Sequence, residues 1–266
     1  MLNVAIGGSN GRMGNSLIHE IMETPEITIG AASVIENSPD LGKDVGLIGG
    51  IDPLHVVTVD DFEQVMDDFD LLFDFTGTEA TIRHLDLCSR YGKKMVIGTT
   101  GFTDAEKEHI KEISEKIAIV FAPNMSVGVN VLFKLIEQAT AVLGDSSDIE
   151  IIEAHHRHKV DAPSGTALHM GEIAAGVLGR DLSDVAVYGR EGKIGAREDK
   201  TIGFESIRAG DIIGDHTIMF AGHGELIEIT HRSSSRMNYA AGALRAALWL
   251  QDKGNGLYSM QDVLGL

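Results

Sequence analysis

Cationic and proton-transferring side chains are concentrated in one short stretch of the chain. Residues 153–167 read Glu-Ala-His-His-Arg-His-Lys-Val-Asp-Ala-Pro-Ser-Gly-Thr-Ala, so three imidazoles, one guanidinium and one amine fall within five positions. Ser164 and Thr166 are residue types that cap helix N-termini, and Pro163 sits where a helix is about to begin. Cations beside the exposed N–H groups of a helix start make an anion site, and a carboxylate is one possible ligand.

Two other interpretations of this stretch stay open. A histidine-rich run can bind a metal, but the spacing offers no separate carboxylate or thiol ligand set. A solvated loop can also join a strand to a helix without any function. We favour the anion site over both and predict no bound metal, because the titratable residues stand directly before a capped helix.

The elements that should hold this stretch are a strand before it and a helix after it. Residues 149–153 have the composition of a strand. Apolar residues at one-face spacing predict the helix: Met170, Ile173, Ala174, Val177 and Leu178.

A second candidate site lies at the start of the chain. Residues 3–7 read as a buried strand, residues 8–14 as a glycine turn, and a helix should follow. Its inward residues should be Leu17, Ile18, Ile21 and Met22. This order is the context of a dinucleotide site, in which Gly8 and Gly11 admit a pyrophosphate and Gly14 lets the helix pack closely. The spacing is G-x-x-G-x-x-G instead of the commoner G-x-G-x-x-G, and a plain tight turn is the alternative.

The second strand should cover residues 27–34. An acidic residue that binds the adenosine ribose is expected near its end. Val34 and Ile35 stand there instead, Glu36 follows slightly late, and no nearby arginine is placed to bind a 2′-phosphate. This segment therefore leaves the choice between NADH and NADPH open.

Further strands alternate with helices in the first half of the chain. Strands are predicted at 71–75, 94–97 and 118–122, with helices between them, one carrying Ile82, Leu85 and Cys88 on one face and one over 103–116. This alternation predicts a parallel doubly wound sheet. Ligands bind such sheets at the carboxyl ends of the strands, where the turns 8–14, 76–78, 98–101 and 123–126 would gather. For each turn taken alone, the alternative to a role in ligand binding is that it simply reverses the chain direction.

The pattern changes after residue 126. A helix should follow, with Val127, Val131, Leu132, Leu135 and Ile136 inward. Beyond a polar segment at 181–200, strand-like runs cover 201–206, 216–220 and 225–230. Strands without regular alternation predict an α+β unit with a mixed sheet. A last helix at 238–250 would pack back onto the first unit.

Composition narrows the class of protein. The chain has 266 residues, a formal net charge of −18, 43% hydrophobic residues and one cysteine. We expect a soluble cytoplasmic protein without disulfides, a signal peptide or a membrane span. Such an acidic chain should repel nucleic acid and anionic membranes, which makes the basic cluster at 155–159 more informative.

These motifs together resemble the 4-hydroxy-tetrahydrodipicolinate reductase (dihydrodipicolinate reductase) family of lysine and diaminopimelate biosynthesis. The resemblance covers nearly the whole chain. It rests on Gly-Arg-Met-Gly at 11–14, Gly-Thr-Thr-Gly at 98–101, Ala-Pro-Asn-Met-Ser at 122–126, residues 153–167 and the segment 236–266. It implies an α/β fold, with a Rossmann-like parallel-sheet domain plus an α+β domain.

The implied domains have different tasks. Residues 1–126 with 237–266 would bind the dinucleotide. Residues 127–236 would bind the substrate and assemble a homotetramer through a mixed sheet.

The resemblance also implies roles for individual residues. His155 and Lys159 would handle protons, His156 would help bind the substrate, and Gly165 and Thr166 would hold a substrate carboxylate. NADPH or NADH would lie on Gly8, Ser9, Asn10, Gly11, Arg12, Met13, Gly98, Thr99, Thr100, Ala122, Pro123, Asn124 and Met125. Some members carry Glu-Arg where this chain has Val34 and Ile35.

The implied reaction is the NAD(P)H-dependent reduction of 4-hydroxy-2,3,4,5-tetrahydrodipicolinate, a small dicarboxylate, to 2,3,4,5-tetrahydrodipicolinate. One alternative is a dinucleotide-binding sensor without catalysis. Another is a different NAD(P)-dependent dehydrogenase of a small acidic substrate. A dehydrogenase that acts through a thiol would have to use Cys88, which we expect in the core.

Overall fold

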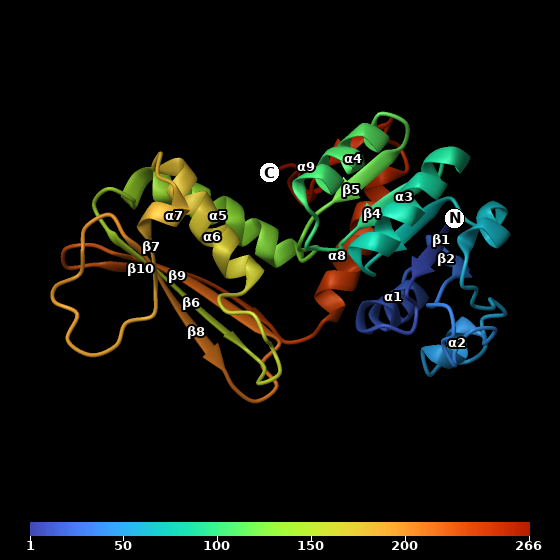
Figure 1. The fold of residues 1–266 in the computed structure, drawn as a ribbon, viewed down its shortest axis with the longest axis horizontal. Helices are drawn as coiled ribbons and strands as arrows, with labels where there is room; N and C mark the ends of the chain where they lie inside the picture. The colour runs from blue at the N-terminus through green and yellow to red at the C-terminus, as the bar shows by residue number, and fades with distance from the viewer. The chain divides into compact units, whose positions relative to one another are not determined.

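The computed structural model describes residues 1–266, which fold into two compact units (Figure 1). The first unit combines Met1–Val127 with Arg236–Leu266, and the second is the continuous segment Gly128–Ser235. The first unit is therefore built from both ends of the described chain.

The first unit contains a six-stranded sheet in the order β11-β5-β4-β3-β1-β2, in which all neighbours are parallel. Its strands are β1 (Leu2–Gly7), β2 (Ile27–Ala32), β3 (Leu71–Asp74), β4 (Lys94–Ile97), β5 (Ala118–Phe121) and β11 (Gly256–Tyr258). Its helices are α1 (Arg12–Met22), α2 (Val45–Ile48), the 3-10 segment η1 (Phe62–Asp68), α3 (Thr78–Tyr91), α4 (Asp104–Ser114), α8 (Met237–Leu250) and α9 (Met260–Leu264).

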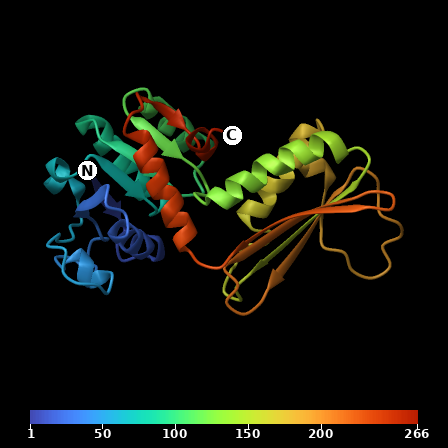
Figure 2. The same cartoon turned by 180° about the vertical axis from the view of Figure 1, so that it is seen from behind.

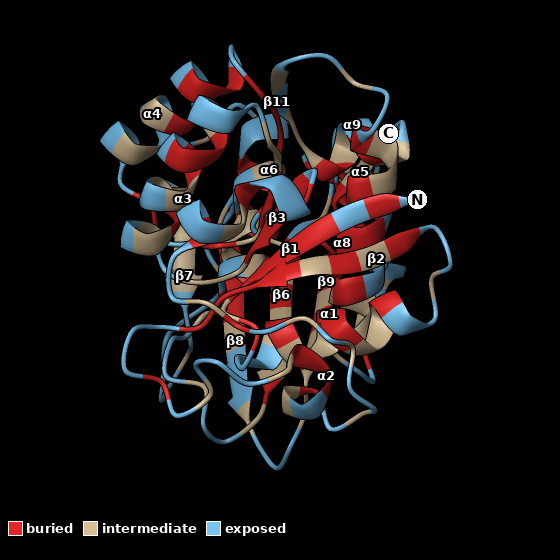
Figure 3. Cartoon of the chain, turned by 90° about the vertical axis from the view of Figure 1, so that its right-hand side faces the viewer, coloured by how far each residue is buried: buried red, intermediate tan, exposed pale blue.

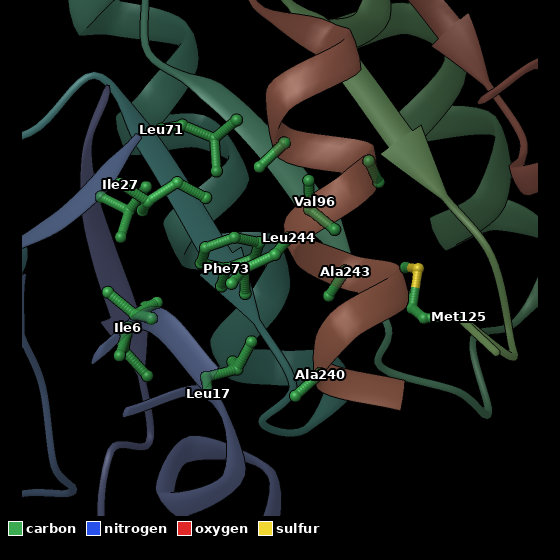
Figure 4. Close-up of a cluster of buried hydrophobic side chains, with 14 of the residues drawn as sticks. Ile6, Leu17, Ile27, Leu71, Phe73, Val96, Met125, Ala240, Ala243 and Leu244 are labelled. Carbon is green, nitrogen blue, oxygen red and sulfur yellow. The ribbon is translucent and has the colours of Figure 1, made fainter. Parts of the chain in front are cut away.

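Helices cover both faces of this sheet, which explains why its central strands are almost entirely apolar. On one face, side chains of β1, β3 and β4 pack against α1 and α8, as Ile6, Phe73 and Leu244 illustrate (Figure 4). On the other face, a second core includes residues of η1, α3 and α4. In Figure 3, β1 is drawn mostly as buried, and α3 and α4 alternate between buried and exposed residues.

Helix α8 returns from the far end of the chain to complete the first core, as predicted. It contacts α1, β4 and β5 and crosses the strands of the first unit in the rear view (Figure 2). The Lys94 ammonium donates to the carbonyl oxygens of Leu250 at 2.9 Å and Gln251 at 2.6 Å, where the helix ends. A cation at a helix C-terminus is stabilising because the last carbonyl groups have no partners within the helix.

The second unit is a five-stranded mixed sheet in the order β10-β9-β6-β8-β7. Strands β6, β8 and β7 run parallel, whereas β9 and β10 run antiparallel to their neighbours. The elements are α5 (Val127–Leu143), β6 (Asp148–His155), α6 (Gly165–Val177), α7 (Leu182–Val185), β7 (Ala186–Tyr188), β8 (Ile202–Arg208), β9 (Gly214–Ala221) and β10 (Leu226–Ser233). Helices α5 and α6 share a core with β6, β8 and β9. The predicted fold class, a Rossmann-like sheet plus an α+β unit, is confirmed.

Some helix faces differ from the prediction. Met22, Val131, Leu135 and Val177 were expected inward but are exposed. Helix α1 instead buries Gly14 with Leu17, Ile18 and Ile21, and α5 buries Val129 and Phe133. Helix α6 buries small residues such as Gly171 and Ala175, because a close helix–sheet contact requires them. The apolar spacing therefore located each helix and part of its buried face, but misplaced residues at the edge of that face. No helix combines the length and the apolar character needed to cross a membrane.

Candidate functional site

The chemistry-bearing stretch lies in the second unit, where β6 ends and α6 begins. Alternate residues of β6 face the helices, so Glu153 and His155 project to the same side of the sheet and are buried. His216 of β9 pairs with Glu153 across the sheet, and Arg208 of β8 pairs with His155. The register of the three strands therefore brings four charged or titratable residues together on neighbouring strands of the sheet.

The carboxylate of Glu153 is the centre of this cluster, and the residue is 1% exposed. Its Oε2 accepts from His155 Nδ1 at 2.6 Å and from Arg208 at 2.8 Å. Its Oε1 accepts from Arg208 at 2.7 Å and from the backbone N–H of Ser164 at 3.2 Å. Burial alone would raise the pKa of Glu153, but the hydrogen bonds from His155 and Arg208 outweigh it and hold the pKa far below its ordinary value. Glu153 is therefore an anion.

Ser164 connects this cluster to the start of α6. It is the N-cap residue, and its Oγ accepts from the Ala167 N–H at 3.2 Å. The same Oγ lies 2.9 Å from His216 Nε2. Burial, followed by the neighbouring His155, lowers the pKa of His216 to about 3, so His216 is neutral at neutral pH. The rings of His155 and His216 meet edge to face, with centroids 5.0 Å apart.

Of the other predicted residues of the stretch, His156 and Lys159 lie on the loop between β6 and α6, and Gly165 and Thr166 lie in the first turn of α6. Lys159 forms an ion pair with Asp161, with 2.8 Å between Nζ and Oδ1. Arg208 also donates to the backbone carbonyl of Asp161 at 2.6 Å, so it links the loop to Glu153. Gly165 is exposed at the first turn of α6, and a side chain there would meet no atom within 4 Å. The helix start thus has open space beside it.

The glycine turn after β1 has the shape that a pyrophosphate needs. Gly8 adopts a φ of +68°, and the Gly11 N–H donates to the Gly8 carbonyl at 2.9 Å. A Cβ at Gly14 would lie 2.4 Å from the Gly8 oxygen, so only glycine permits this approach of α1. Ser9 is fully buried, and both its N–H and its Oγ donate to the Ser33 carbonyl. The turn is therefore fixed against the end of β2, and its geometry fits a dinucleotide.

A cavity of about 1000 Å³ opens beside this turn within the first unit. Its lining includes Gly8, residues 33–37 after β2, residues 60, 61, 63 and 64, and one side of α3. Of the predicted cofactor-binding residues, only Gly8 belongs to this lining. Thr99 is buried, and its hydroxyl lies 2.9 Å from the Thr81 hydroxyl, so its side chain supports the fold.

A buried carboxylate that we did not predict as a site residue stands where β3 ends. Asp74 is fully buried and accepts from Thr76 Oγ at 2.6 Å and Thr81 Oγ at 3.0 Å. Its other oxygen lies 2.7 Å from Nδ1 of His84, which lines the cavity. Burial raises the pKa of Asp74, but these hydrogen bonds and the His84 ring lower it by more. Asp74 ties the turn after β3 to α3.

Comparison with known proteins decides the family. A model described as the N-terminus of dihydrodipicolinate reductase matches residues 2–125, and a model of its C-terminus matches residues 128–264. The chain belongs to the dihydrodipicolinate reductase family. Membership makes it an oxidoreductase with a Rossmann fold.

Solved structures agree with this assignment. A dipicolinate-bound dihydrodipicolinate reductase from Paenisporosarcina sp. TG-14 is 27% identical, with a TM-score of 0.78 over 98% of each chain. An amine dehydrogenase from Mycobacterium smegmatis is 10% identical, with a TM-score of 0.61 over 97% of this chain and 95% of that one. GenD2 from gentamicin A biosynthesis, in complex with NAD, is 12% identical, with a TM-score of 0.62 over 99% of this chain and 90% of that one. The last two share the fold alone.

The structure connects the predicted residues through partners that the sequence did not single out. Glu153 links His155 to the start of α6, and Arg208 links Glu153 to the loop that carries Lys159. The alternation of Glu153 and His155 along one strand was a usable signal for the carboxylate. Arg208 and His216 lie more than fifty residues away in the chain, and only the strand register reveals them.

Proposed function

We propose that this chain is an NAD(P)H-dependent 4-hydroxy-tetrahydrodipicolinate reductase. It would reduce 4-hydroxy-2,3,4,5-tetrahydrodipicolinate to 2,3,4,5-tetrahydrodipicolinate in lysine and diaminopimelate biosynthesis. The supporting observation is the buried pair of Glu153 and His155 beside the open start of α6, in the segment that matches the C-terminal family model. The dipicolinate of the related structure is a planar dicarboxylate of the same class as the proposed substrate.

The substrate would be held by its two carboxylates. The N–H groups at Gly165 and Thr166 stand at the positive end of α6 and suit one carboxylate. Lys159, a cation on a flexible stem, and His156 suit the other. Fixing both ends of the ring limits its orientations, and orientation supplies a large share of rate enhancement in such reactions.

Proton delivery would fall to His155 and Lys159. The substrate would first lose its 4-hydroxyl group as water, which gives a conjugated imine. The nicotinamide cofactor, when bound, would supply a hydride to carbon 4 of this imine. The proton required at carbon 3 would come from the His155–Lys159 pair, in which His155 is already oriented by Glu153. A positioned general acid contributes about 10²–10⁴-fold to such a step.

The cofactor would be NADPH or NADH on the glycine turn, and we propose that NADH binds more tightly. Both arginines that line the cavity already have carboxylate partners: Arg83 pairs with Glu79 at 2.8 Å and Arg90 with Glu63 at 3.4 Å. The acidic Glu36 lines the cavity just after β2, where a ribose hydroxyl acceptor is expected. A 2′-phosphate would add negative charge to this lining.

The assembly would be a cytoplasmic homotetramer. Helices α5 and α6 cover one face of the second sheet, whereas large apolar residues elsewhere on its strands, such as Ile207 and Leu226, are exposed. Light scattering after size exclusion tests this assembly, and a monomer at micromolar concentration would contradict it.

The decisive experiment follows oxidation of NADH and NADPH by absorbance, with the substrate made in situ from pyruvate and aspartate semialdehyde. Substrate-dependent oxidation is expected, with a higher kcat/KM for NADH. A protein that binds the cofactor but oxidises neither would support the non-catalytic sensor. Oxidation with other small acids but not with this substrate would support a different dehydrogenase.

A further inference from the structure

The Glu153 carboxylate has more partners than a structural ion pair needs. It receives two bonds from Arg208, one from the His155 ring and one from the Ser164 backbone. We infer that Glu153, held by Arg208, is a positioning residue that makes Nε2 the proton-exchanging atom of His155 and fixes this ring to the start of α6. The inference rests on the proposed function, because it concerns how His155 acts in that reaction.

The first argument concerns the tautomer of His155. An ionised carboxylate only accepts hydrogen bonds, so the 2.6 Å contact places a hydrogen on Nδ1. The neutral ring then carries its lone pair on Nε2, and the protonated ring has its transferable hydrogen there. Gly214 lies beside this atom, since a Cβ at Gly214 would come within 3.1 Å of Nε2. The missing side chain keeps space open on the reactive side of the ring.

The second argument concerns charge. The titratable groups around the His155 ring are Glu153 on its own strand, Arg208 on β8 and His216 on β9, while the ion pair of Lys159 and Asp161 lies on the loop after β6. Glu153 is the negative group in contact with the ring, Arg208 is a cation, and His216 is neutral. Removal of the negative charge would leave the His155 ring without its anionic partner, so a positive charge on the ring would be less stable. An opposite charge at this distance typically shifts a pKa by about 1–3 units.

The third argument concerns position. Oε2 of the carboxylate holds the His155 ring and Oε1 holds the Ser164 N–H, the N-cap position of α6. Ser164 Oγ in turn lies against His216, which packs edge-on against His155. The proton-exchanging ring and the helix start are therefore set at a fixed distance from each other by one rigid, buried group.

Strand β6 itself offers a matched control. Glu150 lies on the opposite face of the strand and also receives two bonds from one arginine, Arg190, both at 2.8 Å. Arg197 also donates to Glu150, at 2.9 Å. All three of these hydrogen bonds to Glu150 come from arginines, and none comes from a histidine or from α6. Glu150→Gln therefore removes a comparable ion pair from the same strand without touching His155.

The test compares the pH dependence of kcat for the wild type, Glu153→Gln and Glu150→Gln. Glu153→Gln should lower kcat about 10²-fold or more, because the His155 ring loses the carboxylate that fixes its tautomer and its orientation for proton transfer. The pH at which activity is lost on the basic side should fall by about one unit or more. KM for the cofactor should stay unchanged.

The control variant, Glu150→Gln, should keep the wild-type dependence of kcat on pH. Equal effects of the two variants would overturn the inference and leave Glu153 as a structural residue.

A direct measurement needs no variant. Nitrogen-15 spectra of histidine-labelled wild-type protein should show neutral His155 protonated at Nδ1. A hydrogen on Nε2 of the neutral ring would refute the inference even if Glu153→Gln fails to fold. Wild-type protein with the Nδ1–H form but no reductase activity would instead refute the proposed function, so the two failures can be distinguished.

Discussion

Replacing Gly242 by alanine should destabilise the first unit, although alanine is the better helix former. Gly242 is buried in α8, and a Cβ there would lie 1.8 Å from the carbonyl oxygen of Met125. The clashing oxygen belongs to the backbone and cannot rotate away as a side chain could. Either the helix or the turn after β5 must therefore move by more than an ångström. Met125 and the neighbouring residues of α8 belong to one core, as Figure 4 shows.

Two effects of opposite sign decide the magnitude. Glycine to alanine in a helix interior gains up to about 1 kcal/mol. Forcing an extra carbon into a close-packed contact costs about 1–3 kcal/mol, and more when backbone must shift. The expected net result is a loss of about 1–2 kcal/mol, which lowers Tm by roughly 2–8 °C in a domain of this size.

Scanning calorimetry checks this prediction, because it can separate the transitions of the two units. Gly176→Ala is the control: Gly176 is an exposed residue of α6, and a Cβ there meets nothing within 4 Å. The control should gain roughly 0.5–1 kcal/mol. A Gly242→Ala protein with an unchanged or higher Tm would refute the packing argument.

Other predictions concern the proposed site and the buried carboxylates. Lys159→Ala should lower kcat strongly with normal cofactor affinity; an unchanged kcat in steady-state assays would remove Lys159 from the mechanism. Thr166→Val should mainly raise KM for the dicarboxylate, and a pure kcat effect would contradict its assigned role. Gly14→Val should abolish cofactor binding or folding, since its side chain would enter the Gly8 and Ser9 backbone; calorimetric titration with NADH and NADPH tests this. The folded pKa of Asp74 is lowered, so its stabilisation is present at neutral pH and lost as pH falls below about 4. Asp74→Asn should therefore show a shallower loss of Tm with acid than the wild type.

The first unit was largely predictable because its signals are local. Strand β4 has the predicted bounds of 94–97, and the glycine turn follows β1 as expected. The short strand β11 of this unit was missed, as was β7 of the second unit, because three residues carry no detectable periodicity and depend on their neighbours for pairing.

The candidate site was predictable only in part. A strand, a loop and a helix start carry His155, Lys159 and Gly165 within one stretch of sequence. The residue types drew attention to this stretch, and the family resemblance implied the role of each residue. Arg208 and His216 come from other strands, and their relation to Glu153 depends on register across the sheet. A single sequence does not specify that register when the strands are separated by long connections.

The division of the first unit between two chain segments has a consequence for biosynthesis. Residues of β1, β3 and β4 such as Ile6, Phe73 and Val96 are covered in part by α8, which the ribosome makes only after the whole second unit. At typical translation rates this interval is on the order of ten seconds. During it the nascent sheet presents an uncovered apolar face, whereas the continuous second unit can already fold. Chaperone contact during synthesis should therefore concentrate on the segment that was made first.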